Sequence, residues 1–155
     1  MTNHNNMYRM ARTALLAGLM VLASGLANAQ APRCSVLTGT YAVTFSGTFV
    51  APGTTVPMPF NGIGIVTFDG AGRWTGVESG NFGFSVIRFT AGSGTYTLNA
   101  DCTGTQTGRL ADGTATHSDF VVADGGKTIY AIGVDNVGPG NTSSATFTKM
   151  PPSWQ

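Results

Sequence analysis

The stretch GTYTLNADCTGTQT, residues 94–107, decides the fold, because it has the pattern of a strand, a tight turn and a second strand. Residues 95–98 are β-formers, and the threonines of residues 103–107 alternate with small or polar residues at the period of two that a strand requires. Between them lies Asn-Ala-Asp, residues 99–101, and short Asn and Asp side chains favour turns because they hydrogen-bond to their own backbone. The stretch therefore predicts a β-hairpin.

Short β-like segments continue in both directions from this hairpin, separated by turns rich in Gly, Asn and Asp, and no segment beyond residue 29 has a helical period. Three prolines within residues 51–59 predict an exposed loop, because proline cannot donate a hydrogen bond within a central strand. The pattern predicts a single antiparallel up-and-down β-barrel of about eight strands, since closure removes both exposed edges, with a β-sandwich as the alternative. The expected strands lie at residues 38–49, 60–68, 73–79, 82–90, 94–98, 102–110, 116–123, 127–134 and 144–150.

The first 29 residues have the organisation of a signal peptide. Arg9 and Arg12 give a basic start, residues 13–26 are apolar, and the segment ends in Ala-Asn-Ala, a small-x-small cleavage site. The apolar run is shorter than the roughly 20 residues that a membrane-spanning helix needs. We therefore expect cleavage near Ala29, one domain at residues 30–155, no membrane span in the mature chain, and a secreted or periplasmic location.

Beyond the leader, charge is sparse and nearly balanced, with six Lys and Arg residues against seven Asp and Glu residues. A nucleic-acid-binding surface needs clustered basic residues, so we expect no nucleic-acid partner. Thr, Ser and Asn must then supply most of the polar surface. The composition leaves the oligomeric state open.

Cys34 and Cys102 are the two cysteines of the chain, and in an exported protein such a pair predicts one disulfide. His117 is then the only histidine beyond the leader, and the aspartates lie in separate turns. A structural zinc site needs four ligands, and a calcium loop needs closely spaced acids. We therefore expect no metal and no cofactor.

The chain contains the segments LTGTY (residues 37–41), TFDGAG (67–72), GTYTLNADCTGT (94–105) and DFVVADGGK (119–127). These four segments resemble a group of small exported bacterial proteins that are usually described only as hypothetical secreted proteins. The resemblance covers nearly all of the chain beyond the leader and implies no established activity. At the level of the fold, the strand count and the turns are similar to allene-oxide-cyclase, dirigent, lipocalin and avidin barrels. The Trp-rich ligand cage of avidins is absent, since Trp74 and Trp154 are the only tryptophans.

His117, Ser118 and Asp119 have the residue types of a hydrolase triad. Adjacent residues of a strand point to opposite faces, so Ser118 is expected to point away from both neighbours. The sequence also contains no Gly-x-Ser-x-Gly motif. We therefore assign no catalytic residue.

The predicted third and fourth strands offer a candidate ligand site. Trp74 and Glu78 share one face, Phe84 and Arg88 share one face of the next strand, and all four meet if both faces line the lumen. The rings then supply apolar contact, and Arg88 is placed to hold a carboxylate or to pair with Glu78. If these faces lie outside, Glu78 and Arg88 are ordinary solvated charges.

Three functions remain open at this point. The first is an exported barrel that binds a small apolar or amphipathic molecule in its lumen. The second is a structural or protein-interaction domain of the cell envelope, and the third is a barrel enzyme such as a cyclase that acts mainly by shape. An open lumen with apolar walls favours the first or the third, whereas a lumen filled by side chains favours the second.

Overall fold

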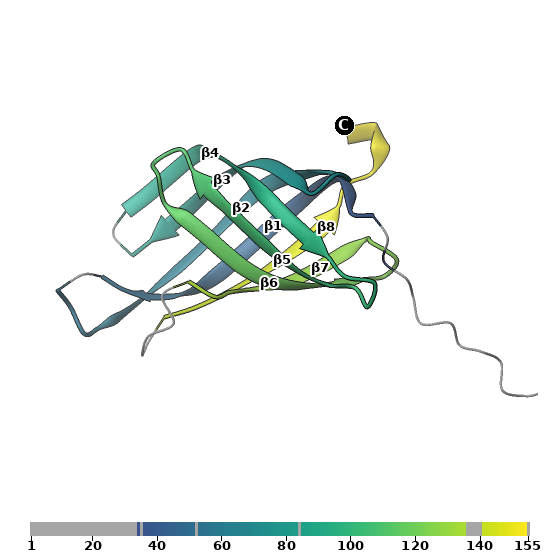
Figure 1. The fold of residues 1–155 in the computed structure, drawn as a ribbon. Helices are drawn as coiled ribbons and strands as arrows, with labels where there is room; N and C mark the ends of the chain where they lie inside the picture. Colours follow the sequence, from purple (N-terminus) through teal and green to yellow (C-terminus); the bar gives the residue numbers. More distant parts are fainter. Residues whose placement is uncertain (1–33, 35, 52, 84, 136–140, 155) are drawn as a thin grey trace, which may run out of the picture. The chain divides into compact units, whose positions relative to one another are not determined.

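The computed structural model describes residues 34, 36–51, 53–83, 85–135 and 141–154, which belong to one compact unit, Pro32–Gln155. Each strand pairs antiparallel with its sequence neighbours, and the last strand pairs with the first (Figure 1), which confirms the predicted closed up-and-down barrel. The predicted signal peptide lies outside the described residues, among which no helix is long and apolar enough to cross a membrane. The elements are β1 (Thr38–Val50), β2 (Pro57–Asp69), β3 (Arg73–Phe82), β4 (Ser85–Leu98), β5 (Thr103–Leu110), β6 (Ala115–Ala123), β7 (Thr128–Gly133), β8 (Thr142–Lys149) and the short 3-10 helix η2 (Pro152–Trp154).

β4 is longer than predicted, because the turn expected at residues 91–93 does not form. These residues remain in the strand and pair with β3 and β5, so that the nine expected segments become eight strands. Gly92 is small for a packing reason, since an added Cβ would lie 3.0 Å from Cδ2 of Leu110. Glycine here marks a close approach of a side chain and not a turn.

The turn predicted at Gly80 and Asn81 is also displaced. β3 continues to Phe82, and the chain reverses through Gly83, whose φ of 63° is left-handed and favours glycine. A register shift after Glu78 places two residues of β4 opposite one residue of β3, which marks a β-bulge in β4. The bulge reverses which residues of β4 face the lumen on the side of the β3–β4 turn, and this affects the predicted site.

β2 begins at Pro57, inside the segment that the prolines predict to be a loop. Pro57 and Pro59 pair with the end of β1. The pairing of β2 with β3 ends at Phe60 and Phe82, so both prolines lie beyond it and interrupt no hydrogen bonds on that side.

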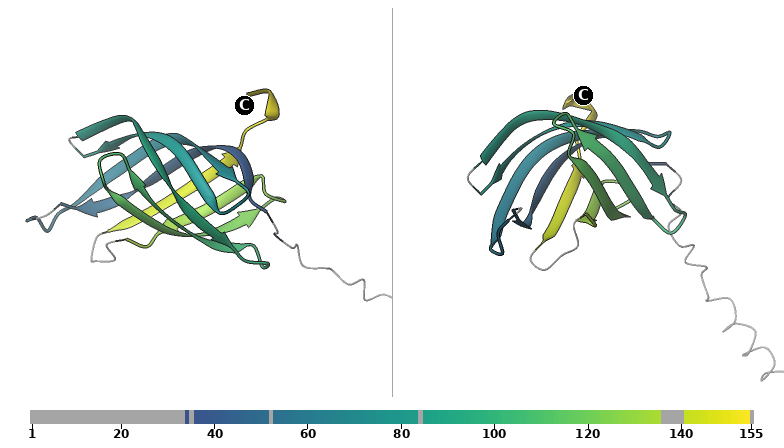
Figure 2. Two further views of the ribbon diagram at one scale, coloured as in Figure 1. Left: turned by 45° about the horizontal axis from the view of Figure 1, so that its top comes forward. Right: turned by 60° about the vertical axis from the view of Figure 1, so that its left-hand side comes forward.

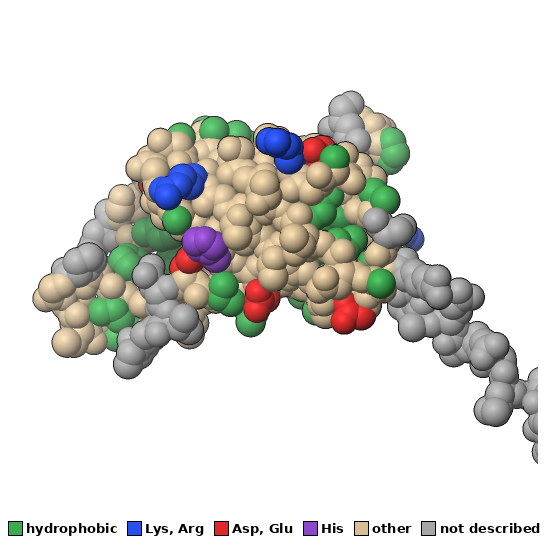
Figure 3. All heavy atoms as spheres, viewed as in Figure 1, with side chains coloured by type: hydrophobic (Ala, Val, Ile, Leu, Met, Phe, Trp, Pro, Cys, Tyr) green, Lys and Arg blue, Asp and Glu red, His purple; other side chains and the backbone are tan. Residues whose placement is uncertain are grey.

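Alternation along the strands separates an outer face rich in threonine from an inner face of large apolar residues and glycines. Threonines pair across strands on the outside, as in Thr97 and Thr105, whose hydroxyl oxygens are 2.8 Å apart. Figure 3 shows few charged side chains on the face in view. Hydroxyl groups therefore replace charges on much of the outer surface, as the composition predicts.

Apolar packing closes one end of the barrel. The segment before β1 places Leu37, which is 1% exposed, in the core at this end. The Tyr96 hydroxyl donates a hydrogen bond to the Leu37 carbonyl oxygen at 2.6 Å, and the Tyr41 hydroxyl donates to the Gly126 carbonyl oxygen at 2.6 Å. The other core residues are Val43, Val66, Phe68, Trp74, Phe120, Ile129, Ala131 and Phe147.

The predicted disulfide between Cys34 and Cys102 is confirmed. The two Cα atoms are 5.0 Å apart, and the bond joins the segment before β1 to the turn between β4 and β5. The Cys34 backbone N–H also donates to the Ala100 carbonyl oxygen at 3.4 Å. This covalent bond and the packing of Leu37 both fix the entering segment to the closed end.

Candidate functional site

The other end of the barrel holds a cavity of about 470 Å³, here called the lumen cavity. The β1–β2, β3–β4, β5–β6 and β7–β8 connections surround this end, which the right-hand view of Figure 2 turns forward. All eight strands contribute lining residues. The volume is in the range of small-molecule sites.

Three strands give the lumen cavity an aromatic wall, which consists of Phe45, Phe60 and Phe82. The Phe60 and Phe82 rings stack with their centroids 5.2 Å apart, and the Phe45 centroid lies 6.3 Å from that of Phe60. Phe49 packs against the same cluster, with its centroid 6.3 Å from that of Phe82. All four side chains are partly exposed, so apolar surface remains available to a ligand.

Glycines opposite the rings explain why the lumen is open. Phe45 pairs directly with Gly62, and Phe60 pairs directly with Gly47. An added Cβ at Gly62 would lie 2.1 Å from Cζ of Phe45, and one at Gly47 would lie 2.7 Å from Cζ of Phe60. Each ring therefore occupies the space of the side chain that its partner strand lacks. The rings lie along the wall, and the middle of the barrel stays free.

Trp74 forms the boundary between the lumen cavity and the closed core. Its side chain is 5% exposed, belongs to the core and also lines the cavity. Its Nε1–H donates to the Thr107 carbonyl oxygen at 3.0 Å, and its ring covers Gly108. Because the indole is held by a hydrogen bond and by packing, it gives the cavity a fixed floor.

Polar side chains enter the lumen cavity from β5 and β6, namely Gln106, Thr116 and Ser118. The Thr116 Oγ1 atom is buried and has no hydrogen-bond partner among the described residues. Buried hydroxyls are normally hydrogen-bonded. This side of the cavity therefore offers hydrogen-bonding groups to a bound molecule.

Glu78 brings a carboxylate to the same cavity. Its side chain is partly buried, and no other described residue forms a hydrogen bond or an ion pair with it. Burial raises the pKa of Glu78 above the usual value, and the carboxylate of Asp112, which also lines the cavity, raises it further. An unpaired carboxyl group next to aromatic rings is the main electrostatic feature of the site.

We expect Glu78→Gln to stabilise the fold at neutral pH. Below the ordinary pKa of 4.5 both the folded and the unfolded chain hold the proton, so Glu78 costs no stability there. As the pH rises through the raised pKa of the folded state, the fold must bury a charge, and its stability falls. Urea unfolding of both proteins should show a higher midpoint for Glu78→Gln at about pH 7.5 and no difference at about pH 3.5.

Asp69→Asn is a control that should change the stability of the fold in the opposite direction. Backbone N–H groups of Arg73 and Ala71 donate to the Asp69 carboxylate at 2.9 and 2.7 Å and lower its pKa. This carboxylate stabilises the fold above its unfolded pKa and loses that effect in acid, so the substitution should destabilise at neutral pH. A Glu78→Gln protein that behaves like Asp69→Asn would contradict the expected desolvation of Glu78.

His117 and Asp135 form a pair at the mouth of the lumen cavity, and the sequence does not predict it. The His117 backbone N–H donates to Oδ2 of Asp135, and the ring Nδ1 contacts Oδ1. Val134, the residue before Asp135, donates its backbone N–H to the His117 carbonyl oxygen at 2.9 Å and so brings the two segments together. Among the described residues, no group of three or more His, Cys, Asp or Glu side chains is placed to hold a metal ion.

Two of the four predicted site residues lie together, since Trp74 and Glu78 both line the lumen cavity. Arg88 does not join them. It is exposed on the outer face of β4, because the β-bulge at Arg88 and Phe89 leaves Ile87 facing inward instead. Within the described chain no ion pair connects Glu78 and Arg88. Phe84 lies outside the described residues.

Phe45 and Phe60 line the cavity but are not among the predicted site residues. Both occupy inward positions of their strands, which the alternation pattern indicates. The signal that would identify them is the pairing of each ring with a glycine on the neighbouring strand. That signal requires the strand register.

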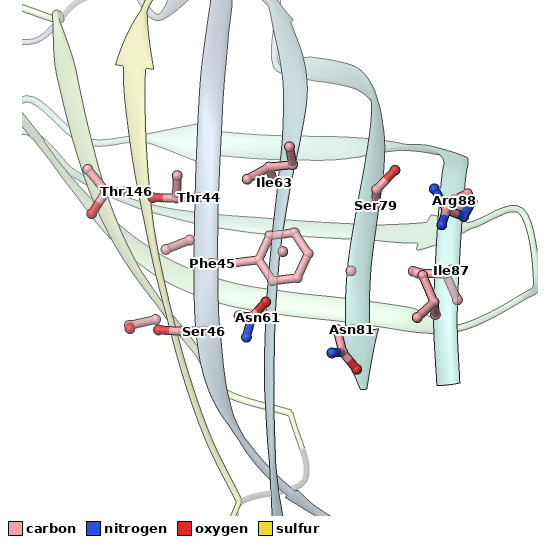
Figure 4. A pocket seen from close by; sticks show the side chains of 15 residues that line it. Thr44, Phe45, Ser46, Asn61, Ile63, Ser79, Asn81, Ile87, Arg88 and Thr146 are labelled. Atoms are coloured by element: carbon pink, nitrogen blue, oxygen red, sulfur yellow. The ribbon is translucent and has the colours of Figure 1, made fainter. Parts of the chain in front are cut away.

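Arg88 borders a groove on the outer face of the barrel instead (Figure 4). The groove has a volume of about 610 Å³, and seven of its 15 lining residues are Thr, Ser or Asn of β1, β2, β3 and β8. Among its described lining residues Phe45 supplies the only ring. The groove is larger than the lumen cavity, but the lumen cavity has the apolar wall that an apolar ligand requires.

No protein-family model and no curated protein matches this chain. Among solved structures, the barrel is similar to a protein described as a de novo design of a fluorescence-activating β-barrel. The two chains are 13% identical, the match covers 74% of this chain and 94% of the designed chain, and the TM-score is 0.48. This likeness concerns the fold alone, and none of these comparisons supports the resemblance to small secreted bacterial proteins.

Proposed function

We propose that this protein binds a small amphipathic molecule in the lumen cavity. The observation that supports this function most strongly is the aromatic wall of Phe45, Phe60 and Phe82, which remains partly exposed inside a cavity of about 470 Å³. Rings of this kind bind aromatic or aliphatic groups through apolar contact. The polar groups of β5 and β6 then orient the other end of the molecule.

The arrangement of ring and glycine argues against a lumen that serves only as packing. Two of the three rings of the aromatic wall lie opposite glycines, and Trp74 covers Gly108 in the same way. A core that only stabilises a fold fills its centre with interlocking side chains. Here the large side chains lie against the wall, and the space between them is left to a ligand.

We expect the neutral fluorescent probe N-phenyl-1-naphthylamine to bind with micromolar affinity and to quench Trp74. The experiment uses a Trp154→Phe background, because Trp74 is then the only tryptophan of the chain. Phe82→Ala removes part of the aromatic wall and should raise the Kd about tenfold, as expected for a buried aromatic contact. Titration of tryptophan fluorescence measures both quantities.

Phe89→Ala is the matched control, because the Phe89 side chain is 78% exposed and lies outside the lumen cavity. It should leave the Kd unchanged, and thermal unfolding should show that both alanine variants remain folded. Failure of the probe to bind, or an equal loss in both variants, would contradict the proposed function. A structural or protein-interaction domain of the cell envelope is then the better interpretation.

We also propose that the protein is secreted or periplasmic, with cleavage near Ala29. The disulfide between Cys34 and Cys102 supports this location, because disulfides persist in oxidising compartments. The leader pattern supports it independently. Mass spectrometry of the protein from periplasm and medium should find a mature N-terminus at Gln30, and a chain that retains residues 1–29 would contradict the proposal.

A further inference from the structure

The charged side chains around the lumen cavity are mostly acidic. Glu78, Asp112 and Asp135 bring carboxylates to its described lining, and His117 is the one described lining residue with a group that can carry positive charge. Two of these carboxylates have local partners. Asp135 contacts His117, and Asp112 accepts a hydrogen bond from the Thr114 backbone N–H at 2.9 Å.

The described basic residues lie elsewhere. Arg88 is exposed on the outer face of β4. Arg109 is exposed on β5 and donates to the Gly113 carbonyl oxygen at 3.0 Å. Lys149 is exposed at the end of β8, with its Nζ atom 5.7 Å from the centre of the Tyr41 ring. Glu78 therefore has no cationic partner within the described part of the chain.

Glu78 and the aromatic wall belong to adjoining positions of the same cavity. Glu78 lies opposite Gly64 on β2, and Phe82 follows it on β3. Because residue 64 is a glycine, no side chain at that position covers Glu78; an added Cβ would lie 3.1 Å from Cβ of Glu78. Glu78 and the rings line the same cavity, so one ligand is able to contact both.

We infer that the natural ligand is an organic amine, with its ammonium group beside Glu78 and its apolar body against Phe45, Phe60 and Phe82. This inference rests on the proposed function of the lumen cavity. A carboxylate and the faces of aromatic rings both attract an ammonium group, and an N–H donor satisfies the unpaired oxygens of Glu78. A carboxylate ligand would meet three acidic side chains and is disfavoured.

A neutral ligand that accepts a hydrogen bond from protonated Glu78 is the competing class, because the pKa of this residue is raised. The two classes respond to pH in opposite directions. The affinity for an amine should rise as Glu78 ionises, whereas the affinity for a neutral acceptor should fall. Asp112, Asp135 and His117 also face the cavity, so the response of Glu78 must be isolated by substitution.

Three ligands with one ring system test the inference: 1-naphthylmethylamine, 1-naphthalenemethanol and 1-naphthylacetate. Each is titrated at about pH 7.5 as a competitor of N-phenyl-1-naphthylamine. We expect the amine to bind about tenfold more tightly than the alcohol and the acetate to bind least. Glu78→Gln should remove most of the advantage of the amine and leave the affinity of the alcohol nearly unchanged.

Asp119→Asn is the matched control, because it removes one negative charge from the outer face of β6. It should preserve the preference for the amine, and this separates a contact with Glu78 from an effect of net charge. An alcohol or acetate that equals the amine overturns the inference, while binding of the neutral probe still supports the lumen site. If neither the probe nor any naphthyl compound binds, the proposed function itself fails.

Discussion

Replacement of Cys34 and Cys102 by serine should lower the free energy of unfolding by about 4 kcal/mol, a change on the order of 10–20 °C in Tm. The bond closes a loop with a sequence separation of 68, and an open chain of that length gains conformational entropy when it unfolds. The loss should also free the segment that carries Leu37 into the core. Urea unfolding of the oxidised parent and of the double variant measures the difference.

Reduction of the parent provides the control for this prediction. Dithiothreitol should lower the stability of the parent to that of the double variant and should leave the double variant unchanged. Cys102 has a left-handed φ of 71°, so a variant with glycine at this position and serine at position 34 should regain part of the loss. A difference of less than about 1 kcal/mol between parent and double variant would show that noncovalent packing alone holds the entering segment.

Gly108→Ala should destabilise the barrel by about 3 kcal/mol, the upper range for overpacking of a core. The new Cβ would lie 2.2 Å from Cζ2 of Trp74 and 2.6 Å from the Ser93 carbonyl oxygen. Neither atom yields easily, because the first belongs to a buried ring and the second to the backbone. Displacement of the indole should break its hydrogen bond to Thr107 and shift the Trp74 emission to longer wavelength in the Trp154→Phe background.

A double-mutant cycle with Trp74→Phe identifies the source of this effect. The smaller ring leaves room beside position 108, so the double variant should be more stable than the sum of the two single changes predicts. Gly113→Ala is the control for backbone strain, because its φ is 90° and no other atom lies within 4 Å of an added Cβ. It should cost about 1 kcal/mol. Equal losses at positions 108 and 113 would exclude packing against Trp74 as the cause.

The sequence predicts those features that depend on neighbouring residues. The hairpin of residues 94–107 forms as expected, with Thr97 opposite Thr105, and Asp101 accepts a hydrogen bond from the Thr103 backbone N–H at 3.1 Å in the turn. The barrel class follows from many such local units. The disulfide is also predictable, because the chain offers one pairing of cysteines.

The candidate site is only partly predictable, because it depends on register and on contacts between distant segments. Trp74 and Glu78 both line the cavity because they share the inward face of one strand. Arg88 does not join them because a β-bulge in β4, which has no signal in the local sequence pattern, reverses the faces of the strand at this point. The pairing of His117 with Asp135 spans β7 and has no local signal.

The pairing of β1 with β8 also governs how fast the barrel is able to fold. Tyr41 pairs with Lys149, 108 positions later, so closure must wait for nearly the whole chain. With the disulfide formed, the chain that connects Tyr41 to Lys149 is half as long. It runs seven residues back from Tyr41 to Cys34, crosses the bond to Cys102, and then runs 47 residues on to Lys149. Halving a loop lowers its closure cost by about 0.6 kcal/mol. Oxidation before closure therefore brings the two ends of the chain together sooner and shortens the time during which the unpaired edges of β1 and β8 are open to other chains.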